Sequence, residues 1–124
     1  MSLFRKKKKV LVADDDPHIG VILKAALSGE GYEVDVATDG EDTVRMGRAN
    51  GYDVVLLDLY MPGRSGIEVL ESWGPAGVLK KTKVLMTTGE SKGDFIQKAH
   101  ELGAAGYIVK PFDPQTLLQK IRDL

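Results

Sequence analysis

The chain has 124 residues, of which 43% are hydrophobic and 28% charged, and its formal net charge is −1. This length corresponds to one domain that is large enough to bury its own core. The absence of cysteine excludes disulfide scaffolds, thiolate metal sites and cysteine nucleophiles. There is no run of 18 apolar residues and no apolar secretory leader, so the default prediction is a cytoplasmic protein without a membrane span.

The charge is distributed unevenly along the chain. Residues 5–9 hold 5 of the 17 basic residues, and residues 10–124 combine 12 basic with 18 acidic residues, a net charge of −6. Such an acidic body is a poor surface for phosphate contacts, which argues against direct nucleic-acid binding. Residues 1–8 are interpreted as a solvated basic lead-in rather than an electrostatic arm, with 1–3 as a remnant of cloning, and residues 9–124 as the domain.

Short apolar segments of strand length alternate with segments of helical spacing. Strands are predicted at residues 10–13, 34–37, 54–57, 84–86 and 107–109. The third segment has no polar alternation, which is typical of a strand covered on both faces. The second segment does alternate and is predicted to be an edge strand.

Helices are predicted around the apolar stripes at residues 19–27, 39–49, 67–73, 95–102 and 117–124. Glycine is expected to end the first, third and fourth helices, at Gly29, Gly74 and Gly103. Asp113 and Pro114 are the expected cap and first-turn proline of the last helix. The apolar stripes on the first and fourth helices include Ile22 and Phe95, respectively. Residues 43, 44 and 47 are the predicted inner face of the weaker second helix. Residues 74–82 are predicted to form a surface loop. Five strands alternating with five helices predict an α/β fold, a doubly wound parallel sheet with helices on both faces.

Polar side chains follow four of the predicted strands. The acidic run 14–16 follows the first strand, Asp58 the third, threonines 87 and 88 end the fourth, and Lys110 follows the fifth. Because the carboxyl ends of parallel strands share one rim, these groups are expected to converge. Crowded carboxylates need a counter-charge, and Mg²⁺ prefers oxygen ligands. The sequence therefore predicts a metal site that accepts an anionic group, in which an aspartate can form an acyl phosphate.

Several residues near this rim have simpler interpretations. Asp16 is assigned as the cap of the first helix, because aspartate is favoured there and three caps are not needed. His18 and His100 are interpreted as solvent-facing helix residues, neither ligands nor phosphodonors, and Trp73 as a packing residue. Asp14 and Asp15 are thus left for the chemistry of the site.

Four sequence motifs lie at strand ends, and together, in this order, they form a specific signature: Val10–Asp16, Leu56–Gly66, Val84–Thr88 and Gly103–Phe112. Together they resemble the receiver domains of two-component response regulators, in particular the small chemotaxis-type form, over about residues 9–123. This resemblance implies a flavodoxin-like sheet of five parallel strands in the order 2-1-3-4-5.

The resemblance also implies a role for each acidic residue. Asp58 would accept a phosphoryl group. Asp15 would bind Mg²⁺, or Mn²⁺, directly, and Asp14 would do so directly or through water. Asp58 itself and the backbone carbonyl of Tyr60 would complete the protein ligands.

The residues at the ends of the last two strands would read the phosphoryl group. Lys110 would contact it and Thr88 would donate a hydrogen bond to it; Thr88 is preferred to Thr87 because the family places this hydroxyl at the last residue of the strand. Tyr107 would change rotamer on activation, as an alternative to ordinary packing at the sheet edge. The bond between Lys110 and Pro111 is expected to be cis.

Departures from the family pattern lie beside these residues. Tyr60 and Glu90 occupy the two positions that tune the lifetime of the phosphoryl group. Gly89 stands where the family commonly has alanine, which predicts a looser loop. None of these departures removes a phosphorylation residue.

The predicted function is a phosphorylation-controlled signalling switch. A histidine kinase or phosphotransfer domain would supply the phosphoryl group, and partner binding would change on the surface of the fourth helix, fifth strand and fifth helix. The protein would not be a turnover enzyme, since it would catalyse only its own phosphotransfer and slow dephosphorylation. The sequence does not identify the output partner or output domain, or distinguish a single-domain regulator from part of a longer protein.

Three other functions fit parts of the sequence. A phosphohydrolase of the haloacid dehalogenase type would use Asp14 and Asp16, but His18 stands where it has threonine or valine, and there is no cap domain. A receiver-like module that accepts no phosphate is disfavoured by the intact Asp15, Asp58, Thr88 and Lys110. A nucleotide or flavin binder lacks a glycine-rich phosphate loop after the first strand.

Overall fold

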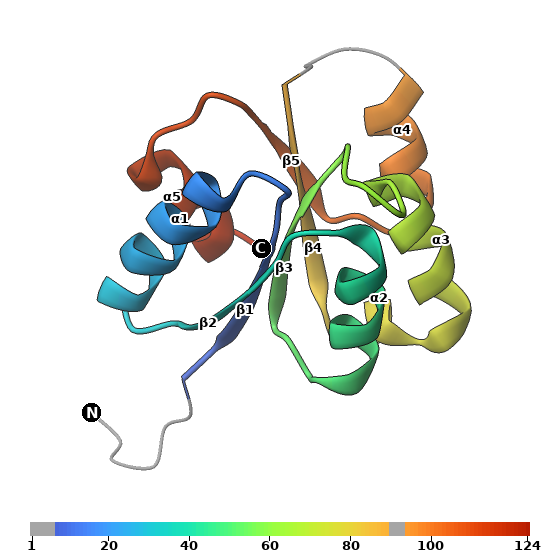
Figure 1. Cartoon of the computed structure of the whole chain (residues 1–124), viewed down its shortest axis with the longest axis horizontal. Helices are drawn as coiled ribbons and strands as arrows, with labels where there is room; N and C mark the ends of the chain where they lie inside the picture. The colour runs from blue at the N-terminus through green and yellow to red at the C-terminus, as the bar shows by residue number, and fades with distance from the viewer. Residues whose placement is uncertain (1–6, 90–93) are drawn as a thin grey trace.

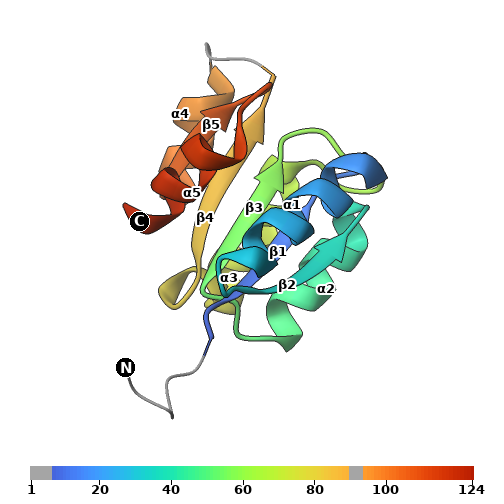
Figure 2. The same ribbon diagram turned by 90° about the vertical axis from the view of Figure 1, so that its left-hand side faces the viewer.

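A computed structural model of the chain describes residues 7–89 and 94–124 and shows one parallel sheet between two layers of helices (Figure 1). The elements in chain order are β1 (Lys9–Ala13), α1 (Pro17–Gly29), β2 (Glu33–Ala37), α2 (Gly40–Ala49), β3 (Val54–Asp58), α3 (Gly66–Ala76), the 3₁₀ helix η1 (Val78–Lys80), β4 (Lys83–Thr88), α4 (Asp94–Glu101), β5 (Gly106–Val109) and α5 (Pro114–Arg122). Figure 2 shows the strands side by side in the order β2-β1-β3-β4-β5, which confirms the predicted fold and the edge position of β2. No helix in these ranges is long and apolar enough to cross a membrane.

Two hydrophobic cores form because successive side chains of a strand point to opposite faces of the sheet. In β1, Val10 and Val12 face α1 and α5, whereas Leu11 and Ala13 face α2, α3 and α4. Every residue of β3 is buried, which confirms that this strand is covered on both faces. The helices therefore occupy both sides of the sheet, with α1 and α5 on one side and α2, α3 and α4 on the other (Figure 1).

Among the described residues, side-chain caps begin α1, α2, α3 and α5 close to the strand ends. Asp16 accepts a hydrogen bond of 2.9 Å from the N–H of His18, and Asp113 accepts one of 2.8 Å from Thr116, as predicted for both helices. Asp39 caps α2 in the same way, and Ser65 forms a reciprocal capping box with Glu68. These caps satisfy N–H groups that have no partner within the helix, and so fix where each strand-to-helix turn ends.

The predicted end of α3 at Gly74 is wrong, and so is the surface loop predicted at 74–82. The helix continues to Ala76 and ends at Gly77, whose φ of 78° is left-handed. A residue before proline resists helical geometry because its N–H and its Cβ clash with the ring, and Gly74 lacks the Cβ part of this clash. The following residues form η1, and the buried hydroxyl of Thr82 donates to the carbonyl of Tyr52 at 2.7 Å.

Three apolar residues predicted on inward stripes lie at the surface instead. Ile22 of α1 is 58% exposed, Phe95 of α4 is 42% exposed, and Leu124, which lies beyond the end of α5, is 37% exposed. Helix α1 buries the narrower stripe of Gly20, Leu23 and Leu27, while the eight-residue helix α4 buries only Ala99. Periodicity identified both helices but did not fix how far each stripe reaches around them.

Glycine in α2 allows that helix to pack closely against α3. Trp73 is fully buried, and its indole N–H donates to the carbonyl of Val44 at 3.2 Å. A Cβ at Gly47 would overlap the Trp73 ring and would lie 2.6 Å from Cε2. The glycine that weakens α2 as an isolated helix is therefore required by the tertiary structure.

The substitution Gly47→Ala should lower the free energy of unfolding by roughly 1–3 kcal/mol, because the added methyl group has no space beside Trp73. Urea unfolding followed by the fluorescence of Trp73 measures this change.

Gly29→Ala is the matched control, because it is also helical and a Cβ there meets nothing within 4 Å. That variant should be as stable as the parent or slightly more stable, since alanine favours a helix. Equal effects of the two substitutions would contradict the packing argument.

Candidate functional site

The candidate site lies where β1, β3, β4 and β5 end. The hydrogen bonding of the sheet continues into the residues that follow the strands. The N–H of Asp14 donates to the carbonyl of Ala37 at 3.0 Å, and the N–H of Lys110 donates to the carbonyl of Thr88 at 2.7 Å. The backbone at both functional positions is thus held by the sheet rather than by a free loop.

Three carboxylates meet at this rim. Asp14, Asp15 and Asp58 each offer one oxygen, and these oxygens all lie within 4.8 Å of one another. Asp14 and Asp58 are buried, whereas Asp15 is exposed. The cluster therefore has two fixed groups at its base and one group open to solvent.

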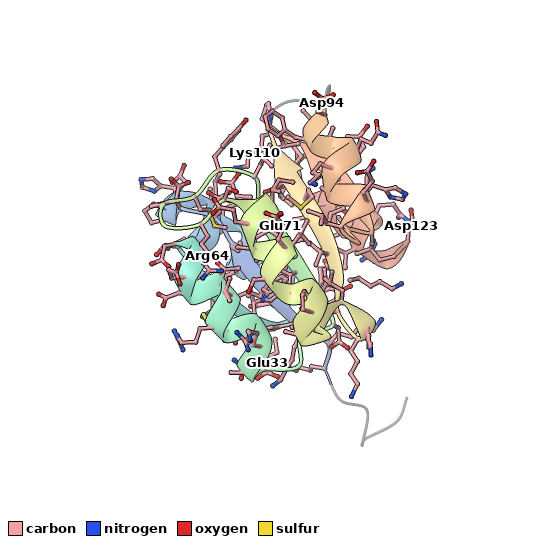
Figure 3. The ribbon with its side chains drawn as sticks, turned by 90° about the vertical axis from the view of Figure 1, so that its right-hand side faces the viewer. Glu33, Arg64, Glu71, Asp94, Lys110 and Asp123 are labelled. Carbon is pink, nitrogen blue, oxygen red and sulfur yellow. The ribbon has the colours of Figure 1, made fainter. Side chains whose placement is uncertain are left out.

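Lys110 supplies the counter-charge to the two buried carboxylates. Its Nζ lies 2.8 Å from Asp14 Oδ2 and 3.4 Å from Asp58 Oδ1. Figure 3 shows Lys110 at the end of the molecule opposite Glu33, which begins β2. Charged groups that are far apart in the sequence thus form one compact arrangement.

Burial and mutual charge shift the ionisation of the site. Burial raises the pKa of Asp58 above its ordinary value, the charge of Asp14 raises it further, and Lys110 opposes both effects. Burial lowers the pKa of Lys110, but the hydrogen bond to Asp14 and the two carboxylate charges outweigh burial, so this pKa is raised overall. The lysine is therefore held in its charged form, while ionised Asp58 lacks full compensation.

Asp14 and Asp16 have different tasks, although they are two residues apart. Asp14 Oδ1 accepts the N–H of Asp16 at 2.9 Å, and Oδ2 accepts Lys110. The carboxylate of Asp16 instead caps α1 through His18, which confirms the predicted cap. In the described part of the chain, the group of acidic residues with metal-ligand spacing leaves Asp16 out.

The loop between β3 and α3 returns closely over the phosphoacceptor candidate. The N–H of Tyr60 donates to Asp58 Oδ1 at 3.5 Å, and the N–H of Gly66 donates to the carbonyl of Leu59 at 2.8 Å. A Cβ at Gly66 would collide with the carbonyl oxygen of Asp58. Glycine at position 66 is therefore what allows α3 to begin beside the end of β3.

The far part of this loop is tied to α2, a feature that the sequence analysis did not predict. The N–H of Gly40 donates to the carbonyl of Pro62 at 2.9 Å, and Arg64 Nε lies 2.8 Å from Glu41 Oε1. A Cβ at Gly40 would collide with the backbone of Arg64. Gly40, directly after the Asp39 cap, was the one local signal of this close approach.

The remaining predicted residues lie on β4 and β5. Thr87 and Thr88 are both buried and point to opposite faces of the sheet, with Thr88 at the end of the strand. Tyr107 is 38% exposed at the sheet edge, and Lys120 Nζ lies 5.7 Å from its ring centroid. The bond between Lys110 and Pro111 is cis, as the resemblance implies. Glu90 and residues 1–6 of the lead-in lie outside the described residues.

Comparison with known proteins identifies the family. Residues 10–122 match the family model described as the response regulator receiver domain, and the chain belongs to this family. It is similar to the chemotaxis response regulator CheY4 of Vibrio cholerae, with a TM-score of 0.89 and 33% identity over 95% of this chain and 98% of that one. This similarity agrees with the strand order and with the predicted class of protein.

Two curated relatives are longer proteins. The transcriptional regulatory protein DltR of Streptococcus agalactiae is 38% identical over 92% of this chain and 50% of its own length. The DNA-binding response regulator MtrA of Mycolicibacterium smegmatis is 34% identical over 94% of this chain and 50% of its own length. The chain thus spans about half the length of the curated relatives it matches.

The donor set of the acidic cluster fits a hard divalent cation. All three side chains offer carboxylate oxygens, and the salt bridges that Asp14 and Asp58 form with described residues both go to Lys110. Three ionised carboxylates beside one ammonium leave an excess of negative charge, and the exposed Asp15 gives access from solvent. Mg²⁺ or Mn²⁺ bound by a few carboxylates, with water in the other positions, suits such a cluster.

The raised pKa of Asp58 predicts a pH-dependent effect of Asp58→Asn in metal-free buffer. At pH 7 the variant should have a higher free energy of unfolding than the parent, because folding no longer buries an ionised carboxylate beside Asp14. Lys110 keeps its partner Asp14 at 2.8 Å. The difference should shrink as the pH falls through the raised pKa and disappear below the ordinary value of 3.8, because the folded parent binds its proton more tightly than the unfolded chain.

Urea unfolding at a series of pH values measures this difference. Glu33→Gln makes the same acid-to-amide change at the opposite end of the sheet and should have no comparable effect at pH 7 (Figure 3). A variant Asp58→Asn that is less stable than the parent at neutral pH would contradict the predicted electrostatic strain.

Proposed function

We propose that this receiver domain is a switch controlled by phosphorylation of Asp58, with a histidine kinase or phosphotransfer domain as the donor. The observation that carries this proposal is the position of Asp58 at the end of β3. Its carboxylate lies within 3.4 Å of Lys110 Nζ and within 4.8 Å of ligand oxygens of Asp14 and Asp15. A nucleophile, a fixed cation and an acidic cluster thus occupy one small volume.

In the proposed reaction a carboxylate oxygen of Asp58 attacks the phosphorus atom of a phosphohistidine. The new O–P bond forms as the P–N bond breaks, and the imidazole leaves with the electron pair. Lys110 lies where its ammonium can stabilise negative charge on the transferred group, because it already contacts Asp58. Thr88, at the end of β4, is the proposed hydroxyl donor to a phosphoryl oxygen.

The residues proposed to hold Mg²⁺ are Asp15, Asp58 and the backbone carbonyl of Tyr60, with Asp14 acting directly or through water. When bound, this ion supplies positive charge to a site that Lys110 alone does not neutralise. Asp14 keeps the ammonium of Lys110 in place through the 2.8 Å contact. Asp15 remains accessible from solvent.

The proposed readout uses the surface formed by α4, β5 and α5. Lys110 follows β5 directly, so a change of charge at Asp58 acts on the end of the strand that bears Tyr107. Tyr107 is partly exposed and borders α5 through Lys120, which supports a role for its ring at a binding surface. A shift between two conformations of this surface would change partner binding.

The geometry favours transfer of a phosphoryl group to the domain's own Asp58 over continuous hydrolysis of phosphate esters. The phosphohydrolase alternative requires Asp14 and Asp16 as a catalytic pair, but the carboxylate of Asp16 caps α1. Asp58 of β3 takes the corresponding place in the acidic cluster. We therefore propose that the domain catalyses its own phosphotransfer and slow dephosphorylation only.

Incubation with a small acyl phosphate and Mg²⁺ should add one phosphoryl group to the parent protein, and intact-mass spectrometry detects it. Asp58→Asn should abolish the gain, because the amide is not a nucleophile for this reaction. Chelation of the metal should also prevent it, and small phosphate esters should not be hydrolysed continuously.

Asp53→Asn is the matched control, because Asp53 lies just before the opposite end of β3 and its side chain accepts the N–H of Lys9. This variant should be phosphorylated like the parent. No mass gain in the parent would favour a module that accepts no phosphate, and continuous phosphate release would favour the hydrolase.

A further inference from the structure

Tyr60 contacts two different parts of the domain. Its backbone N–H donates to Asp58 Oδ1 at 3.5 Å, and its ring packs against Phe95 of α4. The two ring centroids are 6.0 Å apart and the ring planes meet at 74°, an edge-to-face arrangement. One residue therefore links the carboxylate of the site to α4.

This aromatic pair lies outside both hydrophobic cores. Tyr60 is 54% exposed and Phe95 is 42% exposed, and both line a groove of about 570 Å³ together with Leu59 and Ile67. Edge-to-face pairs attract each other through their ring quadrupoles in addition to the area they bury. Because neither ring fills the core, the contact affects the position of Tyr60 more than the stability of the fold.

The rest of the loop is fixed by other means. Its end is tied to α2 through Gly40 and Pro62 and through Glu41 and Arg64, and Gly66 returns to the carbonyl of Leu59. Figure 3 shows Arg64 and Asp94, the first residue of α4, on different sides of α3. Tyr60 lies between these anchors, and its ring contacts the ring of Phe95 on α4.

We infer that Phe95 is a positioning residue for the phosphorylation site and acts through the ring of Tyr60. This inference rests on the proposed function, in which the Tyr60 carbonyl is a metal ligand. Phe95 holds the Tyr60 ring, and the ring orients the backbone that faces Asp58. Because coupling between two sites is reciprocal, occupation of the acidic cluster must in turn stabilise α4.

Titration calorimetry of the full chain with Mg²⁺ tests this inference through a double-mutant cycle. Phe95→Ala should weaken Mg²⁺ binding roughly two- to tenfold, the range expected for loss of one aromatic pair. Tyr60→Ala should weaken Mg²⁺ binding similarly. The double variant should bind Mg²⁺ about as tightly as the single variant with the lower affinity. Unchanged affinity in Phe95→Ala, or losses that add in the double variant, would overturn the inference.

Three further measurements separate positioning from a general structural role. Phe95→Tyr keeps an aromatic ring and should restore the parent affinity. Val21→Ala removes an exposed apolar side chain from α1 on the other face of the sheet, and should leave the affinity unchanged. In the parent, Mg²⁺ should slow hydrogen exchange of the α4 amides, and in Phe95→Ala this slowing should be lost while the urea midpoint is retained.

The two proposals fail in distinguishable ways. A parent chain that neither binds Mg²⁺ nor gains a phosphoryl group overturns the proposed function and this inference together. A parent chain that does both, with a Phe95→Ala variant of identical affinity and identical protection of α4, overturns the inference alone.

Discussion

The structure depends on one electrostatic constraint: two buried carboxylates share the ammonium group of Lys110. Asp14 and Asp58 follow residues that are register partners in β1 and β3, Ala13 and Leu57, so the sheet places the two acids side by side. Buried charges are expensive unless they are paired, and Lys110 pairs with both. The central strands of the sheet thus hold a cluster of charge that no local segment of the chain could hold.

The same constraint makes the site responsive to charge. With three carboxylates around one ammonium, an added cation is favourable and a change in the charge of Asp58 alters every pair in the cluster. Burial and the charge of Asp14 together raise the pKa of Asp58 more than Lys110 lowers it. A site that binds ions or phosphoryl groups costs the folded state some stability, which is the usual relation between stability and function.

The sequence predicted the features that depend on local patterns. The strand ends that bear Asp14, Asp58 and Lys110 followed from apolar runs, and two helix starts followed from the caps Asp16 and Asp113. The parallel arrangement then required these strand ends to meet at one rim, and the three carboxylates do lie together.

Features that depend on tertiary packing could not be predicted from local sequence patterns. Helix α3 continues past Gly74 and ends at Gly77, which has a left-handed φ. The prediction from the Gly74-Pro75 pair therefore placed the end of the helix too early. The exposure of Phe95 depends on how α4 lies against the sheet, which periodicity does not determine. The tie between Arg64 and Glu41 joins residues 23 positions apart, and the neighbouring Gly40 was its one local signal.

The weak packing of α4 explains why it is a suitable element for a switch. It buries a single residue, Ala99, whereas α5 buries three. An element with little buried surface can shift at a small cost in free energy. In the proposed function two connections run from Asp58 toward this helix, one through Lys110 and β5 and the other through Tyr60 and Phe95. Because both begin at the same carboxylate, this proposal requires the site and α4 to respond to each other in both directions.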